Sequence, residues 1–333
     1  MRILVVFNEP VLPALHPEAE SEREVVDVVT SIAKYLDRPH VEVTQRGVGR
    51  DLGKFRETLR AARPDVVLNL FEGFGDDPGS ECEFARLLED EGVPFTGCSS
   101  ATLWQAGRKD IAKQILSSEG LPTSPWTVVE KLPPGECGLN WPVIVKPAFR
   151  DASVGIHQAN VVRQPTMLDE RIRHTAVEYG LPVLVEEFID GREISVALFD
   201  WNDLTVLPFV EAKFASCNGN WSIDSYAAKW DSDSHDHQAR TLHYPAELAP
   251  NLTDDVTATA KAAYRALGCR GFVTIDLRIR DGQPFILELN PNADMKPSTC
   301  LIDLLQMTSV EYGDFLWHMI HGAATRGVAL DRA

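Results

Sequence analysis

Short β-rich segments alternate with segments of helical periodicity along the first hundred residues, and this alternation restricts the possible folds more than any other feature. Apolar residues from Val25 to Leu36 recur at helical spacing, as do Phe84, Leu87 and Leu88 further along. Strands that alternate with helices form βαβ units and a parallel sheet, which predicts an α/β fold. The β-rich runs cover residues 2–7, 41–44, 65–71 and 93–96.

Polar residues follow two of these predicted strands. Asn8 and Glu9 come after the first strand, and Glu72 and Gly73 come after the strand that ends at Phe71. Open parallel sheets bind their ligands at the carboxyl ends of the strands. We therefore expect these two strand ends to contribute to a ligand site.

The charge balance excludes some classes of partner. The chain has 333 residues with 32 Lys and Arg against 49 Asp and Glu, so its formal net charge is −17. Nucleic-acid binding and binding to anionic membranes both depend on basic patches, and we expect neither. A nucleotide ligand needs only a few local lysines and is not excluded.

The sequence also predicts a cytoplasmic protein. No apolar run approaches the roughly 20 residues that span a bilayer, and the first strand is not followed by a signal-peptide cleavage site. The six cysteines include no Cys-x-x-Cys pair, as is typical of reduced thiols in a cytoplasmic chain.

Two changes of pattern divide the chain into three predicted domains. A helix that begins near Lys109 stops at Gly120-Leu121-Pro122 and opens a second segment of strands at 126–129, 142–147 and 183–187. At about 100–200 residues per domain, this length fits two or three domains. The predicted domains cover residues 1–105, 106–191 and 192–333.

A predicted hairpin near the C-terminal end carries the most informative chemistry. Asp281-Gly282 separates two apolar strands at 271–280 and 284–289, and Asp-Gly at that place is a strong hairpin signal. By period-two alternation, Asp276 and Arg278 share one face of the first strand, as Glu288 and Asn290 do on the second. Oxygen ligands of this kind suit Mg²⁺ shared with nucleotide phosphates. The alternative is a sheet face turned to solvent.

Two further segments suggest nucleotide contacts. The strand Val143–Pro147 carries Lys146 near its end and precedes a loop of small residues that contains Ser153 and Gly155. Such a loop can place backbone N–H groups around phosphates, although it lacks the P-loop order and a plain β-turn is the alternative. Further on, Glu186-Glu187-Phe188 puts acceptors beside an aromatic ring, which suits adenine and ribose. Solvated glutamates on an edge strand are the alternative there.

Taken in order, these segments resemble the ATP-grasp carboxylate–amine ligases, and among them the D-alanine–D-alanine ligase group. The resemblance rests on Lys109, Lys146-Pro147, Glu186-Glu187-Phe188-Ile189 with Glu193, and Asp276 followed by Glu288-x-Asn290. It extends to the N-terminal segment through Glu22-Arg23-Glu24-Val25. It implies an ATP-grasp fold, with an N-terminal parallel-sheet (pre-ATP-grasp) lobe on the substrate side and two α+β lobes that clasp the nucleotide.

The resemblance also implies a reaction and a set of roles. ATP phosphorylates a carboxylate to an acyl phosphate, and an amine then attacks to form an amide, with release of ADP and phosphate. Two Mg²⁺ ions, for which Mn²⁺ can substitute, are implied at Asp276, Glu288 and Asn290. The substrates implied are small amino acids or peptide-like molecules, and a homodimer is compatible with the family. The residues implied to bind ATP are Lys109, Lys146, Ser153, Glu186, Phe188, Glu193 and Lys213, the last on a loop that covers the site.

The catalytic positions depart from the group. The arginine that the group has two residues before the metal-binding aspartate is Thr274 here, and a hydroxyl cannot supply the charge that stabilises an oxyanion. Arg278, on the same strand face as Asp276, is expected to supply that charge instead. Glu22 matches the glutamate that orients the first substrate, but the hydroxyls that hold that glutamate in the group are replaced by Ala152 and Phe214.

The substrate positions depart as well. Glu72 stands where the group has a histidine, and Asp294 and Thr299 stand where it has the glycine and serine that bind the second D-alanine carboxylate. An aspartate there repels a carboxylate and suits an amine. We therefore expect a ligase with a different amino-acid or small-peptide substrate. A divergent but genuine D-alanine–D-alanine ligase, a catalytically silent nucleotide-binding protein and an ATP-grasp kinase are the alternatives.

Overall fold

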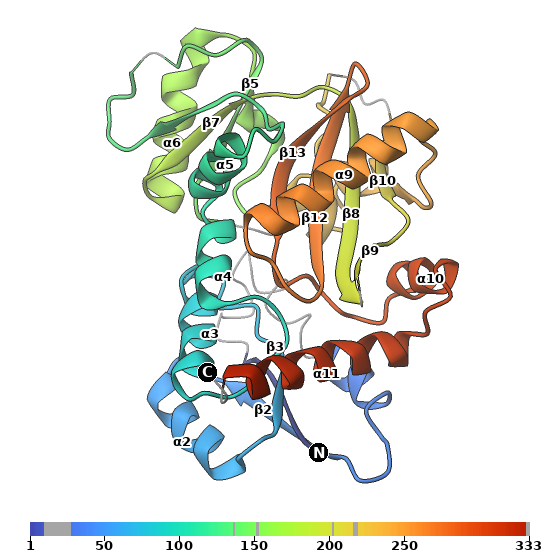
Figure 1. Ribbon diagram of the computed structural model, residues 1–333. Coiled ribbons are helices and arrows are strands. Elements are labelled where there is room, and N and C mark those ends of the chain that lie inside the picture. The colour runs from blue at the N-terminus through green and yellow to red at the C-terminus, as the bar shows by residue number, and fades with distance from the viewer. Residues whose placement is uncertain (10–27, 136, 151–152, 202, 216–218, 331–333) are drawn as a thin grey trace.

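The computed structural model describes residues 1–333 except 10–27, 136, 151–152, 202, 216–218 and 331–333. It contains a parallel three-stranded sheet, an antiparallel four-stranded sheet and an antiparallel six-stranded sheet, which lie in different parts of the molecule (Figure 1). The α/β class predicted from the sequence is confirmed.

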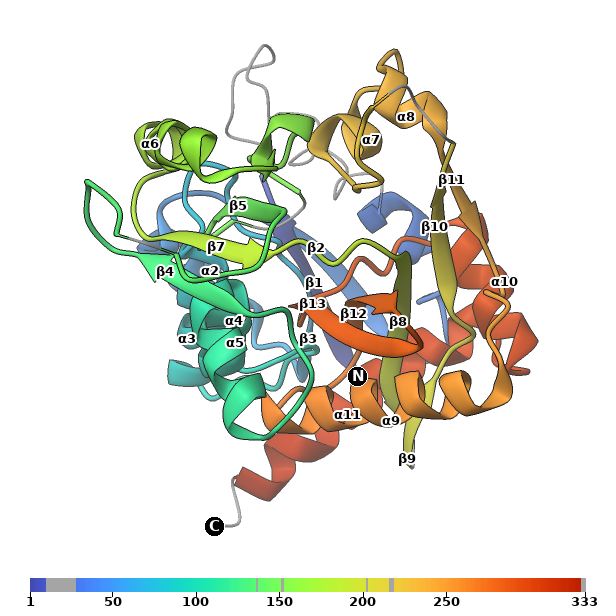
Figure 2. The ribbon, with the colours of Figure 1, turned by 90° about the horizontal axis from the view of Figure 1, so that it is seen from above.

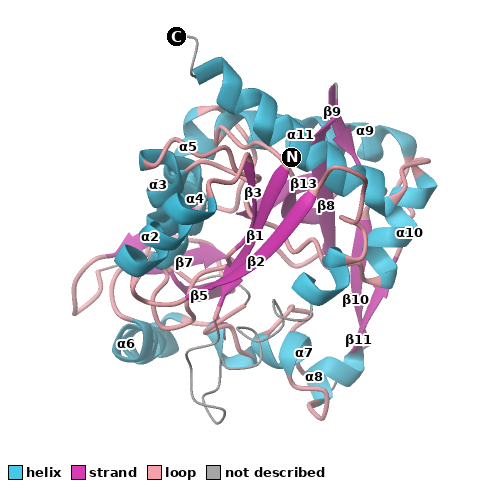
Figure 3. Cartoon of the chain, turned by 90° about the horizontal axis from the view of Figure 1, so that it is seen from below, coloured by secondary structure: helices cyan, strands magenta, loops and turns pink. Residues whose placement is uncertain are grey.

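The N-terminal sheet has the strand order β2-β1-β3 and is parallel throughout, as the alternating pattern predicts. Figure 3 shows its strands from below. The predicted strand at 93–96 forms only one isolated bridge, between Val67 and Phe95. The strands are β1 (Arg2–Asn8), β2 (Glu42–Val48) and β3 (Val66–Leu70), and the helices beside them are α2 (Leu52–Ala62), α3 (Ser80–Asp90) and α4 (Ser100–Gly107).

The first strand is buried on both of its faces, because its side chains alternate between two cores. Leu4 and Val6 lie in the core that contains Phe84 of α3. Ile3 and Val5 lie in the core that contains Phe315 of the C-terminal helix α11 (Tyr312–Leu330). A strand that is buried on both faces, as β1 is, requires a continuous apolar sequence.

The central sheet has the order β4-β7-β5-β6 and its own small core. Helix α5 (Lys109–Ser118) precedes it, and α6 (Leu168–Tyr179) packs against β5 and β7. Its strands are β4 (Trp126–Val129), β5 (Val143–Pro147), β6 (Val161–Val162) and β7 (Val183–Glu187), and the short 3-10 helices η1 (Gln158–Asn160) and η2 (Pro165–Met167) lie between β5 and α6.

The largest sheet has the order β11-β10-β8-β12-β13, and β9 pairs with β8. Helix α9 (Pro250–Ala266) shares a core with it, and Figure 2 shows the small helices α7 and α8 near the end of β11. The strands are β8 (Arg192–Trp201), β9 (Asp203–Val206), β10 (Val210–Phe214), β11 (Arg240–His243), β12 (Val273–Arg280) and β13 (Gln283–Asn290). The remaining helices are α7 (Tyr226–Trp230), α8 (His235–Ala239) and α10 (Thr299–Met307).

The predicted hairpin is the β12–β13 pair. Asp281 and Gly282 both have positive φ angles, of 54° and 76°, as a type I′ turn requires. The register places Asp276 opposite Glu288 and Thr274 opposite Asn290. The two carboxylates and the amide therefore stand next to one another on neighbouring strands.

The first and last segments share their cores. Apolar residues of β1 and β3 belong to the same core as residues of β12, and α11 packs against β3 (Figure 1). The proposed boundaries at 105/106 and 191/192 stay a prediction. Among the described residues, no helix is both long enough and apolar enough to cross a membrane.

Candidate active site

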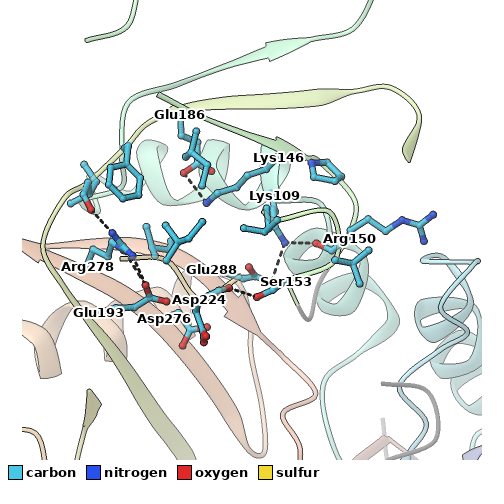
Figure 4. A pocket seen from close by; sticks show the side chains of 18 of the residues that line it. Lys109, Lys146, Arg150, Ser153, Glu186, Glu193, Asp224, Asp276, Arg278 and Glu288 are labelled. Atoms are coloured by element: carbon cyan, nitrogen blue, oxygen red, sulfur yellow. Dashed lines mark hydrogen bonds and ion pairs between the residues drawn. The ribbon is translucent and has the colours of Figure 1, made fainter. Parts of the chain in front are cut away.

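Two adjoining cavities lie where the central sheet faces the β12–β13 hairpin. We call them the inner cavity, which Figure 4 shows, and the outer cavity, which has a volume of about 340 Å³. Six of the seven residues predicted to bind ATP line the inner cavity together, namely Lys109, Lys146, Ser153, Glu186, Phe188 and Glu193. The outer cavity is lined by residues of the N-terminal lobe and by the segment that follows β13.

The buried carboxylate of Glu186 lies between two lysines. Lys146 Nζ lies 3.2 Å and Lys113 Nζ 3.6 Å from Glu186 Oε2, and Ser124 Oγ donates to the same oxygen at 2.9 Å. Burial by itself raises the pKa of Glu186, but Lys113, Lys146 and Ser124 outweigh it and the pKa is lowered. The other oxygen, Oε1, is buried and has no hydrogen-bond partner within the described part of the chain. This arrangement leaves one buried carboxylate oxygen without a hydrogen bond in a residue that lines the inner cavity.

Lys113 is a lysine beside Glu186 that no motif of the sequence predicted. Its ammonium is buried and donates to Thr123 Oγ1 at 2.6 Å and Ser124 Oγ at 3.0 Å. Burial lowers the pKa of Lys113 to about 8, although Glu186 raises it. The available signal was its spacing of four residues from Lys109, which puts both lysines on one face of α5.

Arg278 has a structural partner that the sequence did not predict. Its guanidinium lies over the Phe188 ring, donates to Glu193 Oε2 at 2.6 and 3.1 Å and to Ile189 O at 2.9 Å, and also contacts Ser222 O. Arg278 and Asp276 do share a strand face. Glu193 of β8 stands directly opposite Arg278 and pairs with its guanidinium, and Arg278 also lines the inner cavity. The catalytic role expected for Arg278 stays a prediction.

Asp276, Glu288 and Asn290 come together as the sequence predicts. All three line the outer cavity, and Asp276 and Glu288 line the inner one as well. Lys109 Nζ lies 3.0 Å from Glu288 Oε1 and also donates to Arg150 O (Figure 4). The pKa of Asp276 is raised to about 6, chiefly by burial; Lys229 opposes this rise and the neighbouring Glu288 adds to it.

This donor set fits Mg²⁺. Two carboxylates and an amide supply only oxygen ligands, and Mg²⁺ completes its coordination with water and nucleotide phosphates. In the described ranges, no group of three or more His, Cys, Asp or Glu residues suits a metal ion by itself. The site therefore fits an ion held jointly by protein and nucleotide, and its occupancy stays a prediction.

The structure corrects the assignment of Lys213. Lys213 lies on strand β10 rather than on a covering loop, its side chain is 52% exposed, and it pairs with Glu211 at 3.7 Å. Lys229 on α7 lines both cavities instead. Burial opposes its charge, but Asp224, Asp276 and Glu288 raise the pKa of Lys229.

The predicted substrate residues are only partly brought together. Glu72 and Asp294 line the outer cavity, as do Asn8 and Trp230, so the predicted strand ends do meet at a ligand-sized space. Phe214 lines a different cavity. Thr299 is the first residue of α10, and its side chain lies outside the described part of the structure, as do Glu22 and Ala152.

Ser153 links the two cavities. Its backbone has a positive φ of 62°, and its hydroxyl donates to Asp224 O at 2.8 Å. The side chain lines both the inner and the outer cavity. Ser153 is thus placed at the junction where a phosphoryl group would pass from nucleotide to substrate, and its role stays a prediction.

The site combines three features: carboxylates on the β12–β13 hairpin, two lysines beside the buried Glu186, and two sheets that face each other across the cavities. These features are those of a nucleotide-dependent ligase, and comparison with known proteins places the chain in that class. Residues 115–321 match the family described as D-ala D-ala ligase C-terminus. The protein y4sG of Sinorhizobium fredii is 33% identical over 229 residues, which are 68% of this chain and 64% of that one. The D-alanine–D-alanine ligase of Desulforudis audaxviator is 28% identical over 92% of this chain and 96% of its own length.

The fold agrees with this match. A D-alanine–D-alanine ligase from Bacillus anthracis, solved with ATP, superposes with a TM-score of 0.75 at 21% identity and covers all of both chains. The chain belongs to the D-alanine–D-alanine ligase family. The resemblance, the ATP-grasp fold and the enzyme class predicted from the sequence, an ATP-dependent and ADP-forming ligase, are confirmed.

Proposed function

We propose that the protein joins a carboxylate to an amine through an acyl phosphate, and that its acceptor differs from D-alanine. The observation that carries the first part is the inner cavity, in which Lys109, Lys146 and Glu186 face the Asp276–Glu288 pair. The outer cavity adjoins that pair, so a carboxylate bound there lies next to the γ-phosphate.

The side chains that line the two cavities have distinct roles in this reaction. Glu186 Oε1 accepts a hydrogen bond from the adenine amino group, and Phe188 provides an apolar surface for the base. Lys109, Lys146 and Lys229 offset the negative charge of the phosphates, and Ser153 sits at the junction. Mg²⁺ held by Asp276, Glu288 and Asn290 would neutralise the charge of the transferred phosphoryl group.

Three positions of the outer cavity support a changed acceptor. Thr274, Glu72 and Asp294 all line it. None of the three offers the positive charge that would hold the carboxylate of an amino acid. The metal and nucleotide positions are retained, which argues for working chemistry with a different acceptor.

Genuine D-alanine–D-alanine ligation is the second candidate. It is favoured by the Desulforudis audaxviator relative, which carries that name and aligns over 92% of this chain. A silent nucleotide-binding protein is disfavoured, since such a protein has no need of the paired carboxylates Asp276 and Glu288.

Trapping with hydroxylamine tests the proposal without knowledge of the acceptor. Each member of a panel of amino acids of both configurations is incubated with ATP, Mg²⁺ and hydroxylamine, which converts an acyl phosphate to a hydroxamate. We expect hydroxamate and ADP in equal amounts with at least one donor, and neither product with Glu288→Gln. D-Alanyl-D-alanine formed efficiently from D-alanine alone would favour the second candidate.

A further inference from the structure

Arg278 lies between the residues proposed to bind the base and those proposed to bind the phosphates. The central carbon of its guanidinium is 4.9 Å from the centre of the Phe188 ring. Asp276 stands two residues earlier on the same face of β12, roughly 7 Å away by the rise of a strand. All three residues line the inner cavity. Since the sugar of a nucleoside triphosphate connects the base to the phosphates, a bound nucleotide would place its sugar near Arg278.

A carboxylate accompanies Arg278 at this place. Glu193 stands opposite Arg278 on β8, lines the inner cavity, and has a side chain that is 15% exposed (Figure 4). Arg278 Nε and Nη2 both donate to Glu193 Oε2, at 3.1 and 2.6 Å, so Arg278 does not engage the other oxygen, Oε1. An ionised carboxylate only accepts hydrogen bonds, and the hydroxyls of a ribose can donate them.

The guanidinium of Arg278 is itself fixed by backbone groups. Its Nη1 donates to Ile189 O at 2.9 Å, and its Nη2 also contacts Ser222 O. The Arg278 side chain is only 4% exposed. Because a guanidinium is a rigid planar fork, a guanidinium held in this way also fixes the direction of the Glu193 carboxylate before a nucleotide binds.

On the basis of the proposed function, we propose that Arg278 is a positioning residue for nucleotide selection. It orients Glu193 so that Oε1 accepts a hydrogen bond from a ribose hydroxyl, and the protein therefore prefers ATP to its deoxy analogues. An acceptor that loses its donor in a largely buried site costs free energy. A site that is built to bond a substrate hydroxyl consequently rejects the analogue that lacks it.

Binding of three nucleotides tests the proposal. ATP, 2′-deoxyATP and 3′-deoxyATP are titrated with Mg²⁺ into the full chain in a calorimeter, without donor or acceptor. We expect at least one deoxy analogue to bind about tenfold more weakly than ATP, as the loss of a hydrogen bond to a charged group implies. In Arg278→Met this ratio of Kd values should fall to about twofold or less, because Glu193 is no longer held.

Two further variants separate positioning from a general loss of stability. Arg278→Lys keeps the positive charge but not the planar fork, so its ratio should lie between those of the wild type and Arg278→Met. Arg192→Met is the matched control. Arg192 is the neighbour of Glu193 on β8 and pairs with Glu211 at 2.7 Å, but it does not line the inner cavity. Its ratio should stay as in the wild type.

The failures are distinguishable. If the wild type binds ATP and both deoxy analogues equally, ribose selection is ruled out while nucleotide binding stands. If the preference persists in the folded variants of Arg278, or is lost equally in Arg192→Met, the positioning role is ruled out. Should Arg278→Met fail to fold, Arg278→Lys decides, and an unchanged ratio there overturns the proposal. If ATP itself does not bind, the proposed function fails and this inference fails with it.

Discussion

At the scale of single residues, the site depends on where a few lysines lie. Lys109, Lys146 and Lys229 line the inner cavity together with Glu186, and the buried Lys113 lies 3.6 Å from Glu186 Oε2. Cations placed before the nucleotide arrives cost little reorganisation when phosphate charge develops. Each of these lysines can therefore be tested alone.

Replacing Lys229 with Met should lower turnover by about 100-fold or more, because Lys229 is the lysine of α7 that lines both cavities. Lys213→Met serves as the matched control, since Lys213 is exposed on β10, and its activity should stay within about twofold of the wild type. ADP release measured at saturating ATP compares the two variants. The reverse order of effects would restore the sequence-based assignment of Lys213.

Lys113 should give the stability of the protein a distinct pH dependence. Its pKa is about 8 in the fold against 10.5 ordinarily, so between these values the unfolded chain binds more protons than the folded one. Stability from this group therefore rises with pH across that window, by up to about 1.4 kcal/mol per pH unit, and is flat below it. Urea unfolding of the wild type minus that of Lys113→Met, taken from pH 7 to 10.5, isolates the effect. A difference that does not change with pH would contradict the lowered pKa.

At the scale of elements, pairing across the large sheet decides what each strand presents. β12 lies between β8 and β13, so its polar side chains have neighbours on both sides. Asp276 stands opposite Glu288 on β13, and Arg278 stands opposite Glu193 on β8. One strand therefore contributes to the predicted metal site at one position and to a buried ion pair two residues later.

The ion pair between Glu193 of β8 and Arg278 of β12 should stabilise the folded protein. Arg278→Met leaves Glu193 without its buried partner, and breaking such a pair typically costs about 3–5 kcal/mol. The double variant Arg278→Met with Glu193→Gln should recover part of that loss, because no uncompensated charge remains. Denaturant unfolding measures both. A fully stable Arg278→Met with a large loss of turnover would instead support the catalytic role expected from the sequence.

At the scale of the whole molecule, the inner cavity is built from separate sheets. β5 and β7 of the central sheet supply Lys146 and Glu186, and β12 and β13 of the large sheet supply Asp276 and Glu288 (Figure 4). A ligand that contacts both sheets binds the folded state alone and stabilises it. The three-domain division and a homodimer remain predictions.

ATP with Mg²⁺ should therefore raise the stability of the protein by about 2.7 kcal/mol at a hundredfold excess over Kd. Lys146→Ala should remove most of this shift, because Lys146 lies in the inner cavity beside Glu186. Thermal unfolding with and without nucleotide provides the measurement, and Lys131→Ala, a lysine outside the cavity, is the control. An undiminished shift in Lys146→Ala would remove Lys146 from the nucleotide site.

Features that depend on neighbouring residues follow from the amino-acid sequence alone. The β12–β13 hairpin follows from Asp281-Gly282 between apolar strands, and the shared face of Asp276 and Arg278 follows from the two-residue period of a strand. The parallel N-terminal sheet follows from alternating strand and helix patterns. Local backbone geometry dictates all of these, so the printed sequence suffices to predict them.

Contacts between side chains that are distant in the sequence depend instead on how the elements pack. Arg278 pairs with Glu193 because β8 and β12 are neighbours in one particular register, and the two residues are far apart in the chain. Lys229 rather than Lys213 faces Asp276 for the same kind of reason, as does Lys113 beside Glu186. Period and composition say which way a side chain points from its own strand or helix. Period and composition do not predict which charged side chain lies on the neighbouring element, since that depends on how separate elements pack.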